Sequence, residues 1–355
     1  MLAQFVGGNA TRETLAEGDV VGPYTLMRKI GAGRFANVWT GRDTAGNIAA
    51  VKIYTSNDVD DWRNEAKVFA LAGQCDQIVR YNGVFTHVVF ADNGAPDVLP
   101  CISFGLAQCS LSAVLKELGA LPPDLVRVIM RQVFLGLERL HARGITHADI
   151  KPGNILLSVS AEEIRAMIAD KTPFDAIEVM LADMGSSSVA PDVFSMSAGS
   201  YVYLAPEMIL GRKYDTSVDI WAALAMCFEL LFGMVMFDVI ADSPTTYGDV
   251  DGLIVKNADI AFGAASQSKS RSTSEGRAKV TESHSILIEM ILGPNDDFAR
   301  GCERLSIYDL IRLNNPDMPD NYVAEFAEFL ALGIRYENRA TATDVLRHPW
   351  IHDKK

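Results

Sequence analysis

The segment His147–Asn154 places an aspartate, a lysine and an asparagine close together, directly after a stretch with helical hydrophobic spacing. Asp149 is suited to accept or guide the proton of a hydroxyl group, and Lys151 could offset charge that develops on a transferred phosphoryl group. Asn154 supplies an amide oxygen, a ligand type that Mg²⁺ accepts. The combination indicates metal-dependent phosphoryl transfer, and a chance polar loop after a helix is a much weaker explanation.

A second metal-binding carboxylate follows in Asp183-Met184-Gly185, directly after the apolar run Val179–Ala182, which predicts a strand. Asp183 could bind a metal ion that bridges the β- and γ-phosphates of a nucleotide. The tripeptide alone carries little information. Its position after the Asp149 segment gives it weight.

A phosphate-binding turn and a lysine stand upstream. Gly31, Ala32 and Gly33 lie between two predicted strands, where glycine lets a hairpin backbone approach phosphate oxygens. Such a turn is more often structural, and Ala36 stands where a third glycine is expected. The next strand adds Lys52, which could neutralise the α- and β-phosphates, and Glu65 on a predicted helix could orient that lysine through an ion pair.

Elements that position these residues follow from the hydrophobic pattern. Short apolar or alternating runs bounded by turn residues predict strands at Tyr24–Ile30, Ala36–Arg42, Ile48–Tyr54, Ile78–Val89 and Val98–Leu106. Helical spacing predicts helices over Asp58–Ala72 and Pro123–Arg143. The polar, Gly-rich residues 1–19 predict a flexible lead-in, and about 250–284, rich in Ser, Gly and Ala over Lys256–His284, predicts a flexible insert.

The longest apolar stretch, Ile220–Phe237, approaches the length of a membrane span. Glu229 lies within it, Asp219 precedes it, and no cluster of Lys and Arg follows, so a buried core helix is predicted and no membrane association is expected.

Composition excludes several classes of protein. The chain has 355 residues, 49% of them hydrophobic, and a net charge of −13, which disfavours direct nucleic-acid binding because that depends on Lys and Arg. The 5 cysteines form no CxxC pair and no disulfide framework. With no signal-peptide pattern at the N-terminus, a cytoplasmic or nuclear location is expected.

In this order the motifs resemble those of a eukaryotic protein kinase of the Ser/Thr type, from about Tyr24 to His352. Ala205-Pro206-Glu207 closes the activation segment that Asp183 opens, and Glu207 is expected to pair with Arg339. The resemblance implies an α+β, bilobal kinase fold over residues 20–352. Its N-lobe, about 20–105, is a small antiparallel β-sheet plus one helix, and its C-lobe, about 106–352, is larger and mainly helical.

The resemblance also implies ATP and Mg²⁺ as cofactors and proteins as substrates. Around the adenine it places Val38, Ala50 and Leu156, with Gly105 to Ala107 along its edge and Phe104 as gatekeeper. Lys151-Pro152 is typical of Ser/Thr rather than tyrosine kinases.

Within the superfamily, Gly31–Trp39, the short residue in His147-Ala148-Asp149 and Arg339–Trp350 resemble the SR-protein kinases of the CMGC group, which implies basic, Arg/Ser-rich substrates. Tyr201 departs from the arginine usual in that group. Ala148 replaces the arginine that commonly binds an activation-segment phosphate, and Met184 replaces a phenylalanine. Two alternatives stay open, a pseudokinase acting as a binding scaffold and a small-molecule kinase. The oligomeric state is not predicted.

Overall fold

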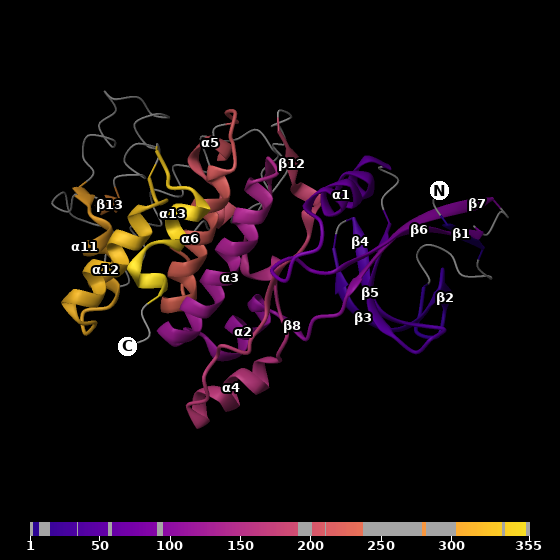
Figure 1. Cartoon of the computed structure of the whole chain (residues 1–355), viewed down its shortest axis with the longest axis horizontal. Helices are drawn as coiled ribbons and strands as arrows, with labels where there is room; N and C mark the ends of the chain where they lie inside the picture. The colour runs from indigo at the N-terminus through magenta and orange to yellow at the C-terminus, as the bar shows by residue number, and fades with distance from the viewer. Residues whose placement is uncertain are drawn as a thin grey trace, which may run out of the picture.

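The computed structural model describes residues 3–6, 15–33, 35–55, 59–90, 95–190, 201–209, 211–236, 279–281, 303–335 and 338–352. The N-terminal part of the chain forms a β-sheet with helix α1 (Val59–Ala72) beside it, and the C-terminal part is mainly helical (Figure 1). This is the α+β, bilobal architecture that the motifs implied. The chain crosses from one lobe to the other after β7, at Gly105.

Seven strands form the sheet of the N-lobe, in the order β1-β6-β7-β5-β4-β3-β2. They are β1 (Ala3–Val6), β2 (Val20–Val21), β3 (Tyr24–Ala32), β4 (Ala36–Asp43), β5 (Ile48–Tyr54), β6 (Tyr81–Phe90) and β7 (Pro96–Gly105). The first three predicted strands are confirmed as β3, β4 and β5, and each pairs antiparallel with the next. The fourth predicted strand begins three residues late, because Ile78 and Val79 instead contact Leu181 of the C-lobe, where the backbone N–H of Val79 donates to the Leu181 carbonyl at 2.9 Å.

The predicted flexible lead-in, residues 1–19, differs from the structure in two places. Ala3–Val6 is a strand that pairs in parallel with Phe85–Val88 of β6. Residues 15–19 are held against β3, where Gly18 donates to the Leu26 carbonyl at 2.9 Å and Leu26 donates to that of Asp19 at 2.8 Å. Backbone pairing with an existing sheet orders these residues, and a four-residue apolar pattern is too short to predict it.

Alternation along β5 places its side chains on two different cores. Val51 and Ile53 join a cluster on the outer face of the sheet, with Leu26, Trp39 and Phe85. Ala50, Lys52 and Tyr54 face the other way, toward α1 and the C-lobe. The strand therefore holds Lys52 rigidly, because its neighbours on both sides are buried.

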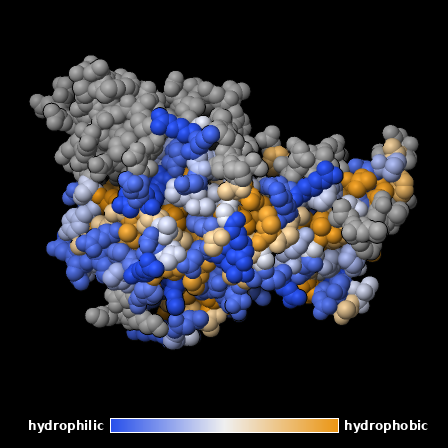
Figure 2. All heavy atoms as spheres, turned by 45° about the horizontal axis from the view of Figure 1, so that its top comes forward, coloured by the Kyte–Doolittle hydropathy of each residue, from blue (hydrophilic) through white to orange (hydrophobic). Residues whose placement is uncertain are grey.

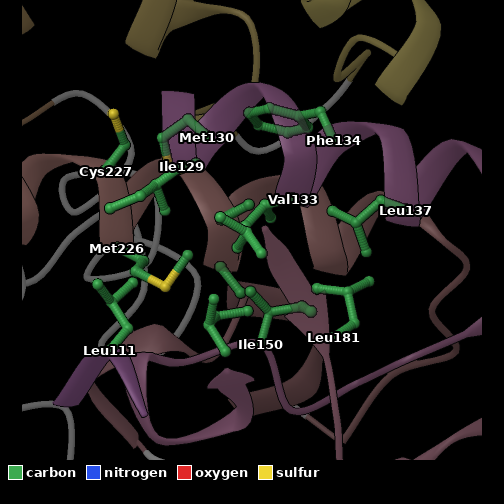
Figure 3. Packing of buried hydrophobic residues seen from close by; sticks show 14 of the residues in the cluster. Leu111, Ile129, Met130, Val133, Phe134, Leu137, Ile150, Leu181, Met226 and Cys227 are labelled. Atoms are coloured by element: carbon green, nitrogen blue, oxygen red, sulfur yellow. The ribbon is translucent and has the colours of Figure 1, made fainter. Parts of the chain in front are cut away.

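The C-lobe is built around α3 (Pro123–His141) and α6 (Ser217–Phe232). Side chains such as Val133 and Met226 fill the space around these helices (Figure 3). The other helices are α2 (Leu111–Leu118), α4 (Ala161–Asp170), α5 (Pro206–Ile209), α11 (Ile307–Asn314), α12 (Asp320–Ala331) and α13 (Ala342–Leu346). Short strands complete the lobe: β8 (Cys109–Ser110), β9 (Ile145–Thr146), β10 (Ile155–Leu157), β11 (Val179–Leu181), β12 (Ser188–Val189), β13 (Lys279–Thr281) and β14 (Glu303–Leu305).

The apolar stretch predicted as a buried helix is confirmed as α6, with different bounds. The helix ends at Phe232, because Gly233 adopts a left-handed conformation, φ 68°, and its N–H donates to the Glu229 carbonyl at 2.7 Å. Within the described ranges, no helix combines the length and apolar character needed to span a bilayer. The surface in Figure 2 is largely hydrophilic, with small hydrophobic patches.

The predicted insert, about 250–284, lies outside the described residues except at Lys279–Thr281, which pairs in parallel with Glu303–Leu305. This pair precedes α11, so the described end of the insert is joined to the C-lobe. An unpredicted helix, α4, follows β10 and contacts α2, with Arg165 paired to Glu117 at 2.7 Å.

Candidate active site

Lys52 connects the two lobes by pairing with two carboxylates. Its Nζ lies 2.7 Å from Oε2 of Glu65 on α1 and 2.8 Å from Oδ1 of Asp183, which follows β11. The predicted pairing of Lys52 with Glu65 is confirmed. The sequence did not predict that Asp183 would share the same ammonium.

Burial and charge act against each other in this cluster. Burial opposes the charged form of Lys52, but the charges of Glu65 and Asp183 raise its pKa above the usual value. Burial raises the pKa of Glu65 despite the charge of Lys52. The Asp183 side chain is partly exposed, and its partial burial opposes ionisation, but its contact with Lys52 lowers the pKa of that carboxyl. Lys52 is thus a fixed positive charge, and Asp183 is an ionised carboxylate.

Asp149, Lys151 and Asn154 form a second cluster in the segment His147–Asn154, which the motifs predict to be the catalytic loop. Lys151 Nζ lies 2.7 Å from Oδ2 of Asp149, and Asn154 donates through Nδ2 to the same oxygen and to the Asp149 backbone carbonyl, each at 2.8 Å. The other carboxylate oxygen of Asp149 is buried and has no hydrogen-bond partner among the described residues. A buried acceptor without a donor is costly in a folded protein, so this oxygen is suited to receive a substrate hydroxyl.

Asp219, near the start of α6, binds the backbone of the catalytic loop. Its carboxylate accepts the backbone N–H groups of His147 and Ala148, each at 2.8 Å, and it lies 2.9 Å from Nε2 of His141. These bonds fix Ala148 in a left-handed conformation, φ 64°, which costs free energy for a residue with a side chain. In the sequence, Asp219 was noted only as the residue that precedes the predicted buried helix. Its contact with the catalytic loop was not predicted.

Two further contacts place the segment after Asp183. Met184, which replaces the expected phenylalanine, is fully buried. Its sulfur accepts a hydrogen bond from Ser187 Oγ at 3.5 Å. Asn64, beside Glu65 on α1, donates from Nδ2 to the Ser187 carbonyl at 2.8 Å. Helix α1 is therefore tied to this segment by Asn64 as well as through Lys52.

The residues predicted around a nucleotide lie on several elements. Gly31 and Ala32 end β3, and Gly31 pairs with Val38 of β4. Gly33 donates to the Ala36 carbonyl at 2.9 Å, which closes the hairpin. Ala50 of β5 pairs with Phe104 of β7.

At the junction of the lobes, Phe104 packs against Phe69 of α1, with ring centroids 4.9 Å apart. Gly105 and Ala107 follow it, and Leu156 lies on β10 in the C-lobe. A methyl group on Gly105 would meet Cβ of Arg80 at 3.1 Å, so a side chain here would require Arg80 to shift slightly. The adenine contacts of these residues stay a prediction.

The oxygen ligands suit Mg²⁺ bound together with a nucleotide. The Asp183 carboxylate is 47% exposed, and the Asn154 amide oxygen is directed away from Asp149 because its nitrogen faces that residue. No group of three or more His, Cys, Asp or Glu side chains in the described part of the chain could hold a metal ion by itself. Mg²⁺ commonly takes one or two protein ligands and completes its shell with phosphate oxygens and water, so Asp183 and Asn154 fit this role.

A cavity of about 420 Å³ lies beside the catalytic loop. Its lining includes Lys116 of α2, Lys151, Tyr203 and Glu229 of α6. The Tyr203 hydroxyl donates to the Glu229 carboxylate at 2.5 Å, and burial raises the pKa of Glu229. The sequence gave no signal for this cavity, because its lining comes from four separate parts of the chain.

A model of the protein kinase domain family matches residues 24–351, and the chain therefore belongs to the protein kinase domain family. It is 28% identical over 230 residues to the serine/threonine-protein kinase ATG1a of Arabidopsis thaliana, with 62% of this chain and 33% of that relative covered. It is 30% identical over 218 residues to the serine/threonine-protein kinase sid1 of Schizosaccharomyces pombe, with 59% and 41% covered.

A third relative, the serine/threonine-protein kinase SRPK of Physarum polycephalum, is 24% identical over 379 residues, with 93% of this chain and 86% of that relative covered. The alignments to the first two relatives cover less than half of their lengths. The predicted membership of the protein kinase superfamily is confirmed, and the subgroup stays a prediction.

Proposed function

We propose that the chain is an active serine/threonine protein kinase that transfers the γ-phosphoryl group of MgATP to protein hydroxyls. The observation that carries the proposal is the double contact of Lys52, at 2.7 Å to Glu65 and 2.8 Å to Asp183. In this arrangement the cation that neutralises phosphates and the carboxylate that binds metal are both in place.

Each residue of the site has a role in that reaction. MgATP, when bound, supplies the phosphoryl group and the cation that neutralises its charge. Asp183 and Asn154 would hold the metal ion, and Lys52 would neutralise the α- and β-phosphates. Asp149 would orient the acceptor hydroxyl and accept its proton, while Lys151, 2.7 Å from Asp149, would offset negative charge on the phosphoryl group.

A pseudokinase that acts as a scaffold is the second candidate, motivated by Ala36, Ala148 and Met184. The experiment is to incubate the purified chain with radiolabelled ATP, Mg²⁺ and a degenerate Ser/Thr peptide library, beside the Asp183→Asn variant. We expect Mg²⁺-dependent labelling of peptides by the natural chain alone. Nucleotide binding without labelling of any peptide would favour the scaffold, and labelling of a metabolite instead of peptides would favour a small-molecule kinase.

We further propose that the substrates are basic, Arg/Ser-rich proteins, as in the SR-protein kinases of the CMGC group. The acids first considered for this preference, Asp238, Asp242, Asp249 and Asp251, lie outside the described residues. Support among the described residues comes from Glu229, whose carboxylate lines the cavity next to Lys151. The extended match to SRPK of Physarum polycephalum also favours this class.

The substrate proposal is tested with paired peptides, one carrying Arg and one carrying Glu before the acceptor serine, at low and high salt. We expect the Arg peptide to react faster and its advantage to shrink with salt, because screening weakens charge attraction. Glu229→Gln should reduce that advantage. Lys116 also lines the cavity, so faster reaction of the Glu peptide would overturn the proposal and assign the opposite preference.

A further inference from the structure

Tyr54 lies two residues after Lys52 on β5, so both side chains point to the same face of the sheet. The Tyr54 hydroxyl donates a hydrogen bond to Oε2 of Glu65. Lys52 Nζ contacts the same oxygen at 2.7 Å. One strand therefore directs two donors at one carboxylate oxygen of helix α1.

This carboxylate is in an unusual position for an ionised group. The Glu65 side chain is 1% exposed, and its second oxygen, Oε1, is buried with no hydrogen-bond partner among the described residues. Lys52 also contacts Asp183 at 2.8 Å, so its charge is divided between two carboxylates. Without the tyrosine hydroxyl, Glu65 would depend on a shared lysine alone, and a buried carboxylate with few donors is costly.

The tyrosine ring is fixed by its surroundings. Tyr54 is 2% exposed, and its ring lies 5.4 Å from Lys52 Nζ, where the ring face attracts the ammonium. The hydroxyl thus has a defined direction, and Glu65 is held from β5 at two points. Helix α1 is also connected to the segment after Asp183 through Asn64 and Ser187.

We propose that Tyr54 is a positioning residue whose hydroxyl, together with Lys52, holds Glu65 and thereby keeps α1 and the Lys52–Asp183 contact in place. This inference rests on the proposed kinase function for its effect on turnover. Its effect on helix α1 does not depend on turnover. The charged and titratable groups that face Glu65 are Lys52 and Tyr54 from β5 and Asp183 from the segment after β11.

The test compares Tyr54→Phe with a matched control, Tyr24→Phe. Tyr54→Phe removes one oxygen atom and keeps the ring above Lys52. Tyr24→Phe removes the same atom on the opposite, outer face of the sheet, where Tyr24 packs against Phe85 with ring centroids 6.0 Å apart. We expect kcat to fall about tenfold or more for Tyr54→Phe, the size expected when a buried charged group loses a hydrogen bond, and to stay unchanged for the control.

A double-mutant cycle separates positioning from packing. Tyr54→Phe is combined with Glu65→Met, which removes the acceptor but leaves Lys52 paired with Asp183. If the hydroxyl acts through Glu65, its removal should cost nothing further in the Glu65→Met background. An equal loss in both backgrounds, or no loss in the natural background, would overturn the proposal.

Amide hydrogen exchange of residues 62–72 in α1 gives a readout besides activity. Exchange should be faster in Tyr54→Phe than in the natural chain or in Tyr24→Phe, and Tyr54→Phe should add no acceleration in the Glu65→Met background. If the natural chain shows no kinase activity, the proposed function fails, and this cycle of exchange rates still decides the role of Tyr54. Unchanged exchange in α1 would then refute it.

Discussion

Arg339 binds Glu207 at the end of the activation segment through both ends of its guanidinium group. Nη1 donates to one carboxylate oxygen, and Nη2 donates to the other at 2.9 Å. The Arg339 side chain is 1% exposed, and its guanidinium lies 5.1 Å from the ring of Trp221. The pairing predicted from Ala205-Pro206-Glu207 is confirmed. It joins the segment that follows the active site to the end of the C-lobe.

Replacing Arg339 should destabilise the fold strongly. Arg339→Met leaves the Glu207 carboxylate, whose side chain is 13% exposed, without its arginine partner, and breaking a largely buried pair in this way costs about 3–5 kcal/mol. The free energy of unfolding in urea measures the loss. The control is Arg347→Met, whose partner Asp344 is 3.4 Å away and whose side chain is 74% exposed, so a change below about 1 kcal/mol is expected. Equal losses for the two variants would contradict the assigned role of Arg339.

Asp183→Asn and Lys52→Met should each lower turnover at least about a hundredfold, because each removes a charge that acts on phosphate or metal. Their effects on stability should differ. The asparagine oxygen can still accept from Lys52, so Asp183→Asn should unfold at nearly the natural temperature. Lys52→Met leaves Glu65 with the Tyr54 hydroxyl as its one remaining donor in the described part of the chain and should unfold at a lower temperature. Near-normal phosphorylation by either variant would remove the catalytic assignment.

Some residues of this site could be predicted from the sequence, and others could not. Lys52, Asp149, Asn154 and Asp183 lie in short motifs whose order along the chain is informative, so their place in one site could be predicted. The role of Tyr54 could not be predicted, because a tyrosine in a strand is most often a packing residue.

Contacts between distant parts of the chain were also missed. Asp219 and His147 are 72 residues apart, and no local pattern connects the carboxylate to the loop that it holds. Helix α4 was missed although Ser160 and Glu163 form a capping box at its start. That helix has only two buried positions, Ala161 and Ile164, and its hydrophobic pattern is correspondingly weak.

Acid should weaken the N-lobe through His87. The side chain is buried, and its Nδ1 accepts the N–H of Gly22 at 3.3 Å, which requires the neutral ring. Burial lowers the pKa of His87, opposed by the charge of Asp19. The unfolded chain, with a histidine pKa of about 6.5, therefore binds the proton more readily. Stability that is complete above this pH is lost as the pH falls from about 6.5 through the lower folded-state pKa.

His87→Gln isolates this effect, because glutamine offers an oxygen to Gly22 and does not titrate. The free energy of unfolding should be measured in urea for both proteins at pH 7.5, 6.5 and 5.5. We expect the natural chain to lose more stability than the variant between the two lower pH values. A difference between the proteins that does not change with pH would show that His87 is not responsible.

Activity should not require phosphorylation of the activation segment. At Ala148 a methyl group cannot make the bidentate contact that arginine makes with a phosphate, and the backbone N–H of Ala148 is already bound to Asp219 at 2.8 Å. The serines that could be modified, Ser195, Ser197 and Ser200, lie outside the described residues.

The measurement is peptide phosphorylation by protein produced in bacteria together with a phosphatase, with mass spectrometry to confirm that no phosphate is attached. We expect full turnover from this unmodified protein, and treatment with an upstream kinase should change the rate by less than about twofold. Ser200 should be replaced separately from Ser195 and Ser197, because the resemblance to protein kinases implies that its hydroxyl serves Asp149 and Lys151 and not regulation. Loss of activity in Ser195→Ala/Ser197→Ala, or an unmodified protein that stays inactive until an upstream kinase acts, would show that a phosphate is required after all.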